Sequence, residues 1–198
     1  MRLAENSIAT KNRADEVFDL VSLARTIKGG RLEQMIRESE KKAVARKQKL
    51  DLPRMVELLA KHRVEFVVIG GYAVAFHGAP RFTRDLDILY RTTEQNVDRL
   101  LAALRESGLP LKIAREDLLN KTTNYKVGFP PDQLDLSAED AFKGIRWEEA
   151  WKTAVEGELA GAKVRFLGLE QLITAKRAAG RTQDEADVER LLHRLGEW

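Results

Sequence analysis

The sequence predicts an α+β protein with a helical extension at its N-terminus. Short apolar or alternating segments, which are typical of strands, are interleaved with longer segments whose apolar residues recur at helical spacing. Hydrophobic residues make up 43% of the 198 residues, enough for a domain with a sizeable core. We therefore divide the chain into a basic helical extension, residues 1–50, and a globular domain, residues 51–198.

The extension is predicted to contain two helices, over residues 14–28 and 31–49, separated by Gly29-Gly30. It holds 12 of the 34 Lys and Arg residues and 7 of the 31 Asp and Glu residues, so its net charge is +5 and that of the remainder is −2. Such a charge can attract nucleic acid or an acidic partner, but a solvated helix face is the favoured interpretation.

The first half of the domain begins with a helix, because Asp51 is a suitable N-cap and Pro53 is tolerated in the first turn. The apolar run 65–69 indicates a buried strand that ends at Gly70-Gly71. Alternation of polar and apolar residues predicts a strand over 85–90. The expected order is helix 53–62, strand 65–69, helix 72–77, strand 85–90 and helix 93–108.

The second half is expected to contain short strands and three helices. Trp147 and Trp151 lie on one face of the first of these helices, where a core role is favoured over base stacking. Thr182 and Glu185 have the spacing of a capping box for the last helix. The expected order is strands 125–129 and 133–136, helix 139–155, strand 163–167, helix 169–179 and a final helix from residue 182.

Three features point to phosphoryl chemistry. Gly70-Gly71 follows a strand and precedes a helix start, which suits phosphate, although most such pairs are simply tight turns. Asp85 and Asp87 alternate with apolar residues and share one strand face, roughly 7 Å apart. Such a pair is either a divalent-metal site or a solvated pair on an edge strand.

Asp135 is the third feature, a single acid between two leucines on a short strand candidate. If this strand lies beside strand 85–90, Asp135 falls on the same face as Asp85 and Asp87. Two-metal phosphoryl transfer requires such a third carboxylate near the attacking oxygen. A lone Asp on a strand is otherwise usually a solvent-facing residue.

The order of these features resembles a known family. The stretch VVIGGYAVAFHGAPRFTRDLDIL is similar to the signature of the DNA polymerase β-like nucleotidyltransferase superfamily. The similarity is greatest to a small bacterial branch that includes abortive-infection toxins and relatives of antibiotic nucleotidyltransferases. It covers roughly residues 51–195 and implies a small mixed β-sheet with helices packed against it. The family commonly has Gly-Ser where this chain has Gly70-Gly71.

The resemblance also implies roles for individual residues. Asp85, Asp87 and Asp135 would be the catalytic residues and would bind Mg²⁺ or Mn²⁺. The other implied residues would bind the nucleotide, and these are Gly70, Gly71, Thr83, Arg84 and Lys176. Lys176 would neutralise phosphates, the alternative being an exposed helix lysine. Arg181, Asp184 and Asp187 match the family's late segment, or else form a helix-cap network.

The expected function is transfer of a nucleoside monophosphate from a nucleoside triphosphate such as ATP to a hydroxyl. The acceptor is left open among RNA, protein and a small molecule such as an antibiotic; a toxin would also have a cognate antitoxin. The alternative is a non-catalytic binding module of the same fold. The absence of Cys excludes disulfides and thiolate ligands, and no apolar run is long enough to span a membrane. We therefore expect a cytoplasmic protein.

Overall fold

The computed structural model describes residues 33–40, 50–109, 111–129, 132–142 and 144–196. The chain divides into two units, residues 1–46 and 47–198. In the first unit, residues 33–40 are helical, within the second predicted helix. The helix predicted over 14–28 lies outside the described residues. Of the described helices, none has the length and apolar character needed to cross a bilayer.

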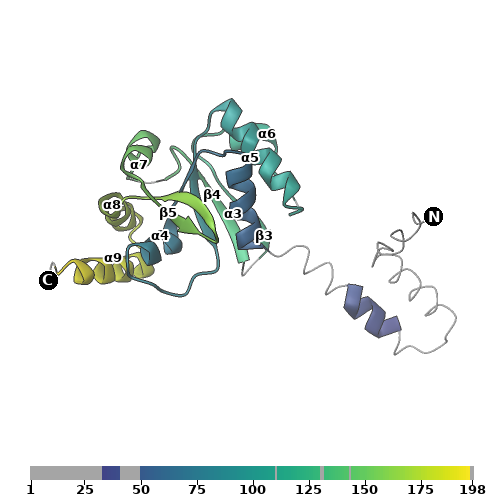
Figure 1. Cartoon of the computed structure of the whole chain (residues 1–198), viewed down its shortest axis with the longest axis horizontal. Coiled ribbons are helices and arrows are strands. Elements are labelled where there is room, and N and C mark those ends of the chain that lie inside the picture. Colours follow the sequence, from purple (N-terminus) through teal and green to yellow (C-terminus); the bar gives the residue numbers. More distant parts are fainter. Residues whose placement is uncertain (1–32, 41–49, 110, 130–131, 143, 197–198) are drawn as a thin grey trace, which may run out of the picture. The chain divides into compact units, whose positions relative to one another are not determined.

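A six-stranded mixed sheet forms the centre of the second unit, in the order β3-β4-β2-β1-β6-β5 (Figure 1). The neighbouring strands β2 and β4 are parallel, and so are β1 and β6, while the remaining neighbours are antiparallel. The strands are β1 (Phe66–Val68), β2 (Leu86–Tyr90), β3 (Asn124–Phe129), β4 (Asp132–Ala138), β5 (Val155–Leu159) and β6 (Ala162–Phe166). This arrangement confirms the predicted α+β class.

Helices cover both faces of this sheet. In Figure 1, α3, α5 and α6 lie on one side, and α4, α7, α8 and α9 on the other. Helix α3 packs against α5 and β6, whereas α4 packs against β2 and α8, and α8 packs against α9. The helices are α3 (Leu52–Lys61), α4 (Gly70–Phe76), α5 (Glu94–Glu106), α6 (Arg115–Leu118), α7 (Trp147–Thr153), α8 (Leu169–Ala179) and α9 (Thr182–Leu195).

Strand alternation separates the core from the opposite face of the central strands. Leu86 and Ile88 of β2, like Leu134 and Leu136 of β4, are fully buried. Burial of one leucine or isoleucine side chain stabilises the fold by about 1.5–3 kcal/mol, which holds both strands in register. The intervening acidic side chains must therefore point to the other face.

Most predicted elements are present, with bounds that shift by a few residues. Asp51 is the N-cap of α3 and accepts a hydrogen bond from the backbone N–H of Arg54 at 3.1 Å. Gly180 ends α8 in the left-handed conformation, at φ 63°. The Trp147 and Trp151 rings stack at 5.3 Å between centroids, and Trp147 is buried, as a core role requires.

Two predictions need correction, and one helix was not predicted. The helix expected over 139–155 is limited to α7, and Val155 begins the edge strand β5. The short helix α6 was not predicted. The expected capping box of the last helix does not form, because Arg181 is the N-cap residue of α9 and makes no side-chain cap. Thr182 is already inside the helix.

The boundary between the two units gives a testable prediction. Leu50 is buried in the core of the second unit, with 6% of its surface exposed, so the start predicted at Asp51 would remove a core side chain. A fragment of residues 47–198 should therefore fold cooperatively and melt within a few degrees of the whole chain. A fragment starting at Asp51 should melt lower, and calorimetry of both checks this. Failure of the longer fragment to fold would show that residues 1–46 belong to the same folding unit.

Candidate active site

The predicted catalytic carboxylates come together on the open face of β2 and β4. Because the two strands are parallel and in register, Asp87 is the Cα partner of Asp135. Asp85 lies directly before β2, and its Oδ1 accepts a hydrogen bond from the backbone N–H of Gln133 at 3.1 Å. Strand β2 lies between β4 and β1 and not at an edge of the sheet. This excludes the alternative that Asp85 and Asp87 are a solvated pair on an edge strand.

The glycine turn after β1 lies directly against these carboxylates. Gly70 has a φ of +62°, and a Cβ atom added to it would lie 2.1 Å from Asp87 Oδ2. A Cβ on Gly71 would lie 2.7 Å from the Thr83 hydroxyl. Both positions therefore require glycine, the first for conformation and space and the second for space.

The carboxylate of Asp87 is perturbed by its surroundings. Burial, followed by the charges of Asp135 and Asp85, raises its pKa from 3.8 to about 6, and a backbone hydrogen bond from Gly71 and the charge of Lys126 oppose the rise. The charged form of Asp87 is thus unfavourable without additional positive charge. A cation bound beside it would relieve this cost.

Lys126 provides part of that positive charge. It lies on β3 as the Cα partner of Asp135, and its Nζ donates to Asp135 Oδ2 at 2.6 Å. The hydrogen bond with Asp135 raises the pKa of Lys126, so the lysine is charged. The other oxygen of Asp135, Oδ1, is buried and accepts no hydrogen bond from any residue that the structure describes.

These residues fit a divalent cation in their chemistry, although they are not arranged around one. Carboxylate oxygens are the ligands that Mg²⁺ prefers, and the buried Oδ1 of Asp135 lacks a partner. Among the described residues, however, no group of three or more His, Cys, Asp or Glu side chains is placed to hold a metal ion. Asp85 instead accepts a hydrogen bond from Gln133, and Asp135 accepts one from Lys126.

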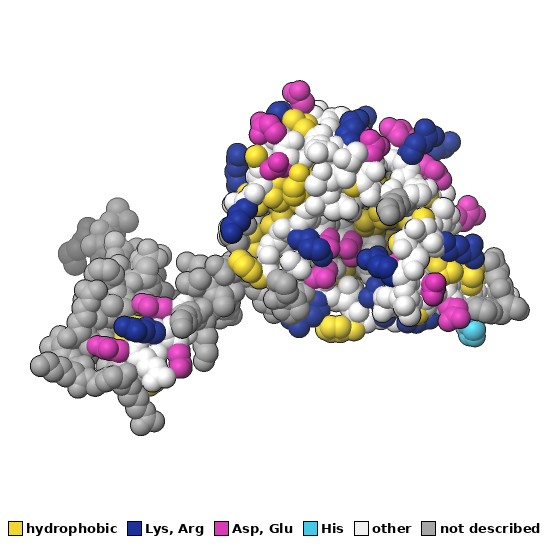
Figure 2. Space-filling model, turned by 180° about the vertical axis from the view of Figure 1, so that it is seen from behind, with side chains coloured by type: hydrophobic (Ala, Val, Ile, Leu, Met, Phe, Trp, Pro, Cys, Tyr) yellow, Lys and Arg dark blue, Asp and Glu magenta, His cyan; other side chains and the backbone are white. Residues whose placement is uncertain are grey.

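A pocket of about 420 Å³ opens beside the carboxylates. One part of its lining is charged and comprises Asp87, Lys126, Asp135, Lys176, Arg181 and Asp184. The remainder combines Gly70 and Phe142 with small or apolar residues of α8 and with residues of β3 and β4 that include Asn124, Tyr125 and Ser137. Figure 2 shows a face on which acidic side chains lie in a hollow, with basic side chains on either side. The pocket therefore offers both charged and apolar surface to a ligand.

The far wall of the pocket is held by a buried ionic network between α8 and α9. Lys176 Nζ lies 2.7 Å from Asp184 Oδ1 and 2.8 Å from Asp187 Oδ2, and all three side chains are at least 93% buried. Arg181 Nε pairs with Asp184 Oδ2 at 2.6 Å, but its side chain is 77% exposed. Burial opposes ionisation of both aspartates, but the hydrogen bonds from Lys176 and from the arginines lower the pKa of both below the ordinary value.

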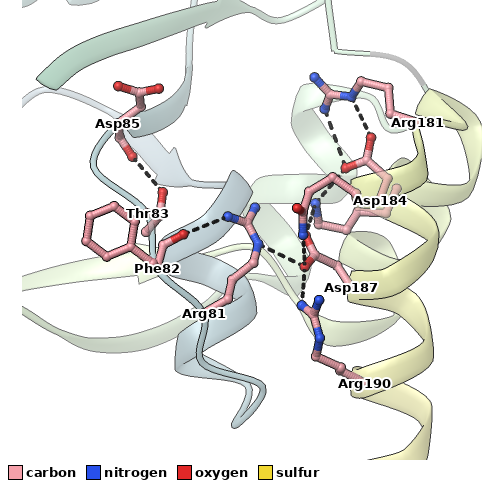
Figure 3. A network of polar contacts seen from close by, with 10 residues as sticks. Arg81, Phe82, Thr83, Asp85, Arg181, Asp184, Asp187 and Arg190 are labelled. Carbon is pink, nitrogen blue, oxygen red and sulfur yellow. Dashed lines mark hydrogen bonds and ion pairs between the residues drawn. The ribbon is translucent and has the colours of Figure 1, made fainter. Parts of the chain in front are cut away.

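The same network reaches the segment that precedes β2 (Figure 3). Arg81 Nε donates to Asp187 Oδ1 at 2.8 Å, and Arg190 Nη1 donates to the same oxygen at 2.9 Å. At the other end of the segment, Arg84 makes two hydrogen bonds to Asp132, at 2.7 and 2.9 Å. The segment leading to Asp85 is therefore fixed by ion pairs on both sides.

Several of these placements differ from the predicted ones or were not predicted. Lys176 is buried, which excludes an exposed helix lysine, and its ammonium is shared by two carboxylates. Thr83 packs against Gly71, and Arg84 is engaged by Asp132. Sequence reasoning missed Lys126, because its position opposite Asp135 depends on the pairing of β3 with β4.

The glycine turn leads to a prediction for Gly70→Ala. Alanine at this position would have to adopt the left-handed conformation of Gly70, and its methyl group would displace the side chain of Asp87. We expect the free energy of unfolding to fall by about 1–3 kcal/mol. Gly161→Ala is the matched control, because Gly161 also has a positive φ of +84° but has no atom within 4 Å of an added Cβ. If urea unfolding shows that both variants lose the same free energy of unfolding, Asp87 does not restrict the side chain at position 70.

Two solved structures are similar to this chain. The antibiotic-resistance factor ANT(2'')-Ia superposes with a TM-score of 0.50 and 16% identity, over 72% of this chain and 81% of that chain. An antigenic nucleotidyltransferase-like protein from Paracoccidioides brasiliensis gives a TM-score of 0.48 and 16% identity, over 73% and 77% of the two chains. At this identity the first similarity concerns the fold alone. The comparison with curated proteins gave no match.

The family comparison covers most of the chain. The model of the aminoglycoside-2''-adenylyltransferase family matches residues 51–191, which include the glycine turn, the three carboxylates and the ionic network. This agrees with the resemblance to nucleotidyltransferases, and to antibiotic nucleotidyltransferases in particular. The chain belongs to the aminoglycoside-2''-adenylyltransferase family, a family of nucleotidyltransferases.

Proposed function

We propose that this protein transfers a nucleoside monophosphate from a nucleoside triphosphate to a hydroxyl group, with Mg²⁺ or Mn²⁺ held by Asp85, Asp87 and Asp135. The observation that supports this most strongly is the register of β2 with β4. It places Asp87 beside Asp135, next to a glycine turn and a pocket with Lys and Arg in its lining. Two adjacent carboxylates with one raised pKa are a costly arrangement for a purely structural face.

The glycine turn, Arg181 and Asp135 have separate parts in the proposed reaction. The glycine turn lets the phosphates approach Asp87 closely, and Arg181 is an exposed cation at the pocket for their charge. Asp135 accepts the proton of the acceptor hydroxyl, whose oxygen bonds to the α-phosphorus. The bond from that phosphorus to the bridging oxygen breaks, and pyrophosphate leaves. A bound divalent cation would supply Lewis-acid stabilisation of the charge on the phosphates.

The acceptor that the family favours is a hydroxyl of an aminoglycoside antibiotic. Within the proposal this makes the protein an antibiotic-modifying enzyme. RNA and protein hydroxyls are the alternatives. Either acceptor would make the enzyme a toxin with a cognate antitoxin. No residue that the structure describes favours RNA or protein as the acceptor. A non-catalytic module of this fold is the fourth alternative, which predicts no transfer to any acceptor.

A labelling experiment tests the proposal. The whole chain is incubated with each α-³²P nucleoside triphosphate, Mg²⁺ or Mn²⁺, and in turn an aminoglycoside panel, bulk RNA or cell protein. We expect label in the aminoglycosides, dependent on metal and lost in Asp135→Asn. Label in RNA or protein instead would change the acceptor class but keep the reaction. No metal-dependent transfer to any of the three pools would refute the proposed activity.

A further inference from the structure

Lys126 occupies a position that conflicts with metal binding. Its Nζ lies 2.6 Å from Asp135 Oδ2, so the ammonium already neutralises one of the carboxylates proposed to bind the metal. The lysine side chain is 61% exposed, whereas that of Asp135 is only 23% exposed. The long exposed side chain can move at little cost in packing, while the strand holds the carboxylate in place. A cation at Asp135 would therefore compete with a tethered ammonium.

The displaced ammonium would need a new anionic partner. Lys126 lines the same pocket as Gly70 and Asp87, and this pocket also contains Lys176 and Arg181. Those two cations are already paired with Asp184, and Lys176 also with Asp187. Once separated from Asp135, Lys126 would lack a carboxylate partner, in contrast to Lys176 and Arg181, the other described cations in the pocket lining. A triphosphate in the pocket carries the charge that it requires.

From this geometry we propose that Lys126 couples metal binding to nucleotide binding, as a counter-ion that exchanges Asp135 for the phosphates. The inference rests on the proposed function, since it assumes a metal at Asp135. Without nucleotide, metal binding would separate the Lys126–Asp135 pair and bring positive charges together. With nucleotide, the phosphates would accept the ammonium as the metal enters. Lys126 is thus a positioning residue that acts through Asp135, and it would disfavour metal binding to the empty enzyme.

The test measures Mn²⁺ affinity of the whole chain by electron paramagnetic resonance, with and without the non-hydrolysable probe α,β-methylene ATP. The Lys126→Gln variant removes the charge but keeps a polar side chain of similar length. Without the probe, we expect Lys126→Gln to bind Mn²⁺ about fivefold more tightly than the wild type. The gain in affinity on adding the probe should shrink by a similar factor, because the coupling is reciprocal.

Two further variants separate this role from a general effect of charge. Lys126→Arg keeps the positive charge and should behave like the wild type. Lys121→Gln removes another paired lysine, whose Nζ lies 2.7 Å from Glu139 and which does not line the pocket, and it should leave both affinities unchanged. Unchanged or weaker Mn²⁺ binding by Lys126→Gln without the probe would overturn the inference. Absence of Mn²⁺ binding in the wild type with the probe would instead refute the proposed metal site itself.

Discussion

Asp87→Asn is expected to reduce nucleotidyl transfer by at least about a hundredfold while stabilising the metal-free protein. Activity falls because the amide loses the negative charge that the proposed metal requires. Stability rises because the amide has no charge to bury, whereas the wild-type carboxylate is held among Asp85 and Asp135 with its pKa raised to about 6. We expect a gain of about 1–2 kcal/mol at pH 7.5, measured by urea unfolding in the presence of a chelator.

The gain should depend on pH with a defined sign. The folded-state pKa of Asp87, about 6, lies above its ordinary value of 3.8, so the wild type loses stability as the pH rises from about 4 through 6. The difference between Asp87→Asn and the wild type should therefore be small near pH 4 and largest above pH 7. The lowered pKa values of Asp184 and Asp187 act in the opposite sense, and only below their ordinary value of 3.8.

Asp140→Asn is the matched control for these measurements, because Asp140 is exposed. It should change neither activity nor the pH dependence. An Asp87→Asn protein that is destabilised at pH 7.5 would show that the carboxylate is satisfied in the fold. Full transfer activity in the same variant would remove Asp87 from the mechanism.

Lys176→Met is expected to destabilise the protein by about 3 kcal/mol. The substitution keeps most of the side-chain volume but leaves Asp184 and Asp187 buried without the ammonium they share, at 2.7 and 2.8 Å. The arginines that remain in the network compensate only in part, since Arg181 and Arg190 are 77% and 45% exposed, and the less exposed Arg81 pairs with Asp187 rather than Asp184. Chemical denaturation of both proteins at pH 7.5 measures the loss.

The matched control is Lys163→Met, at an exposed position of β6, where we expect a change within about 0.5 kcal/mol. If Lys176→Met is as stable as the wild type, the buried network does not hold α8 against α9. A stable Lys176→Met protein with weakened nucleotide binding would instead favour the direct phosphate contact that the family resemblance implies for Lys176.

The sequence was sufficient to predict strands β2 and β4 and the face of the sheet to which their acidic side chains point. Alternation of Leu86, Asp87 and Ile88 requires the carboxylate to face away from the core, and the same holds for Asp135 between its two leucines. It could not establish that β4 lies beside β2, because strand order depends on tertiary packing. The sequence therefore predicted that Asp87 lies beside Asp135 only on the condition that their strands are neighbours, which the fold shows.

Other features depended on contacts that no local pattern encodes. Val155 was assigned to the end of a helix, yet it begins the edge strand β5, because Ala160 and Gly161, both with positive φ, make a hairpin turn back to β6. The predicted capping box of α9 failed because Thr182 is the first residue of the helix, so that Arg181 and not Thr182 is the N-cap residue. The site roles of the remaining predicted residues stay predictions.

The most direct test of the central claim is to follow the label from α-³²P and γ-³²P nucleoside triphosphate in parallel, with the wild type and Asp135→Asn. The aminoglycoside panel serves as acceptor. If Asp85, Asp87 and Asp135 catalyse nucleotidyl transfer, the α-label enters the acceptor, the γ-label appears in pyrophosphate, and Asp135→Asn does neither although it still binds nucleotide. Transfer of the γ-label to the acceptor, or full activity in Asp135→Asn, would contradict the claim.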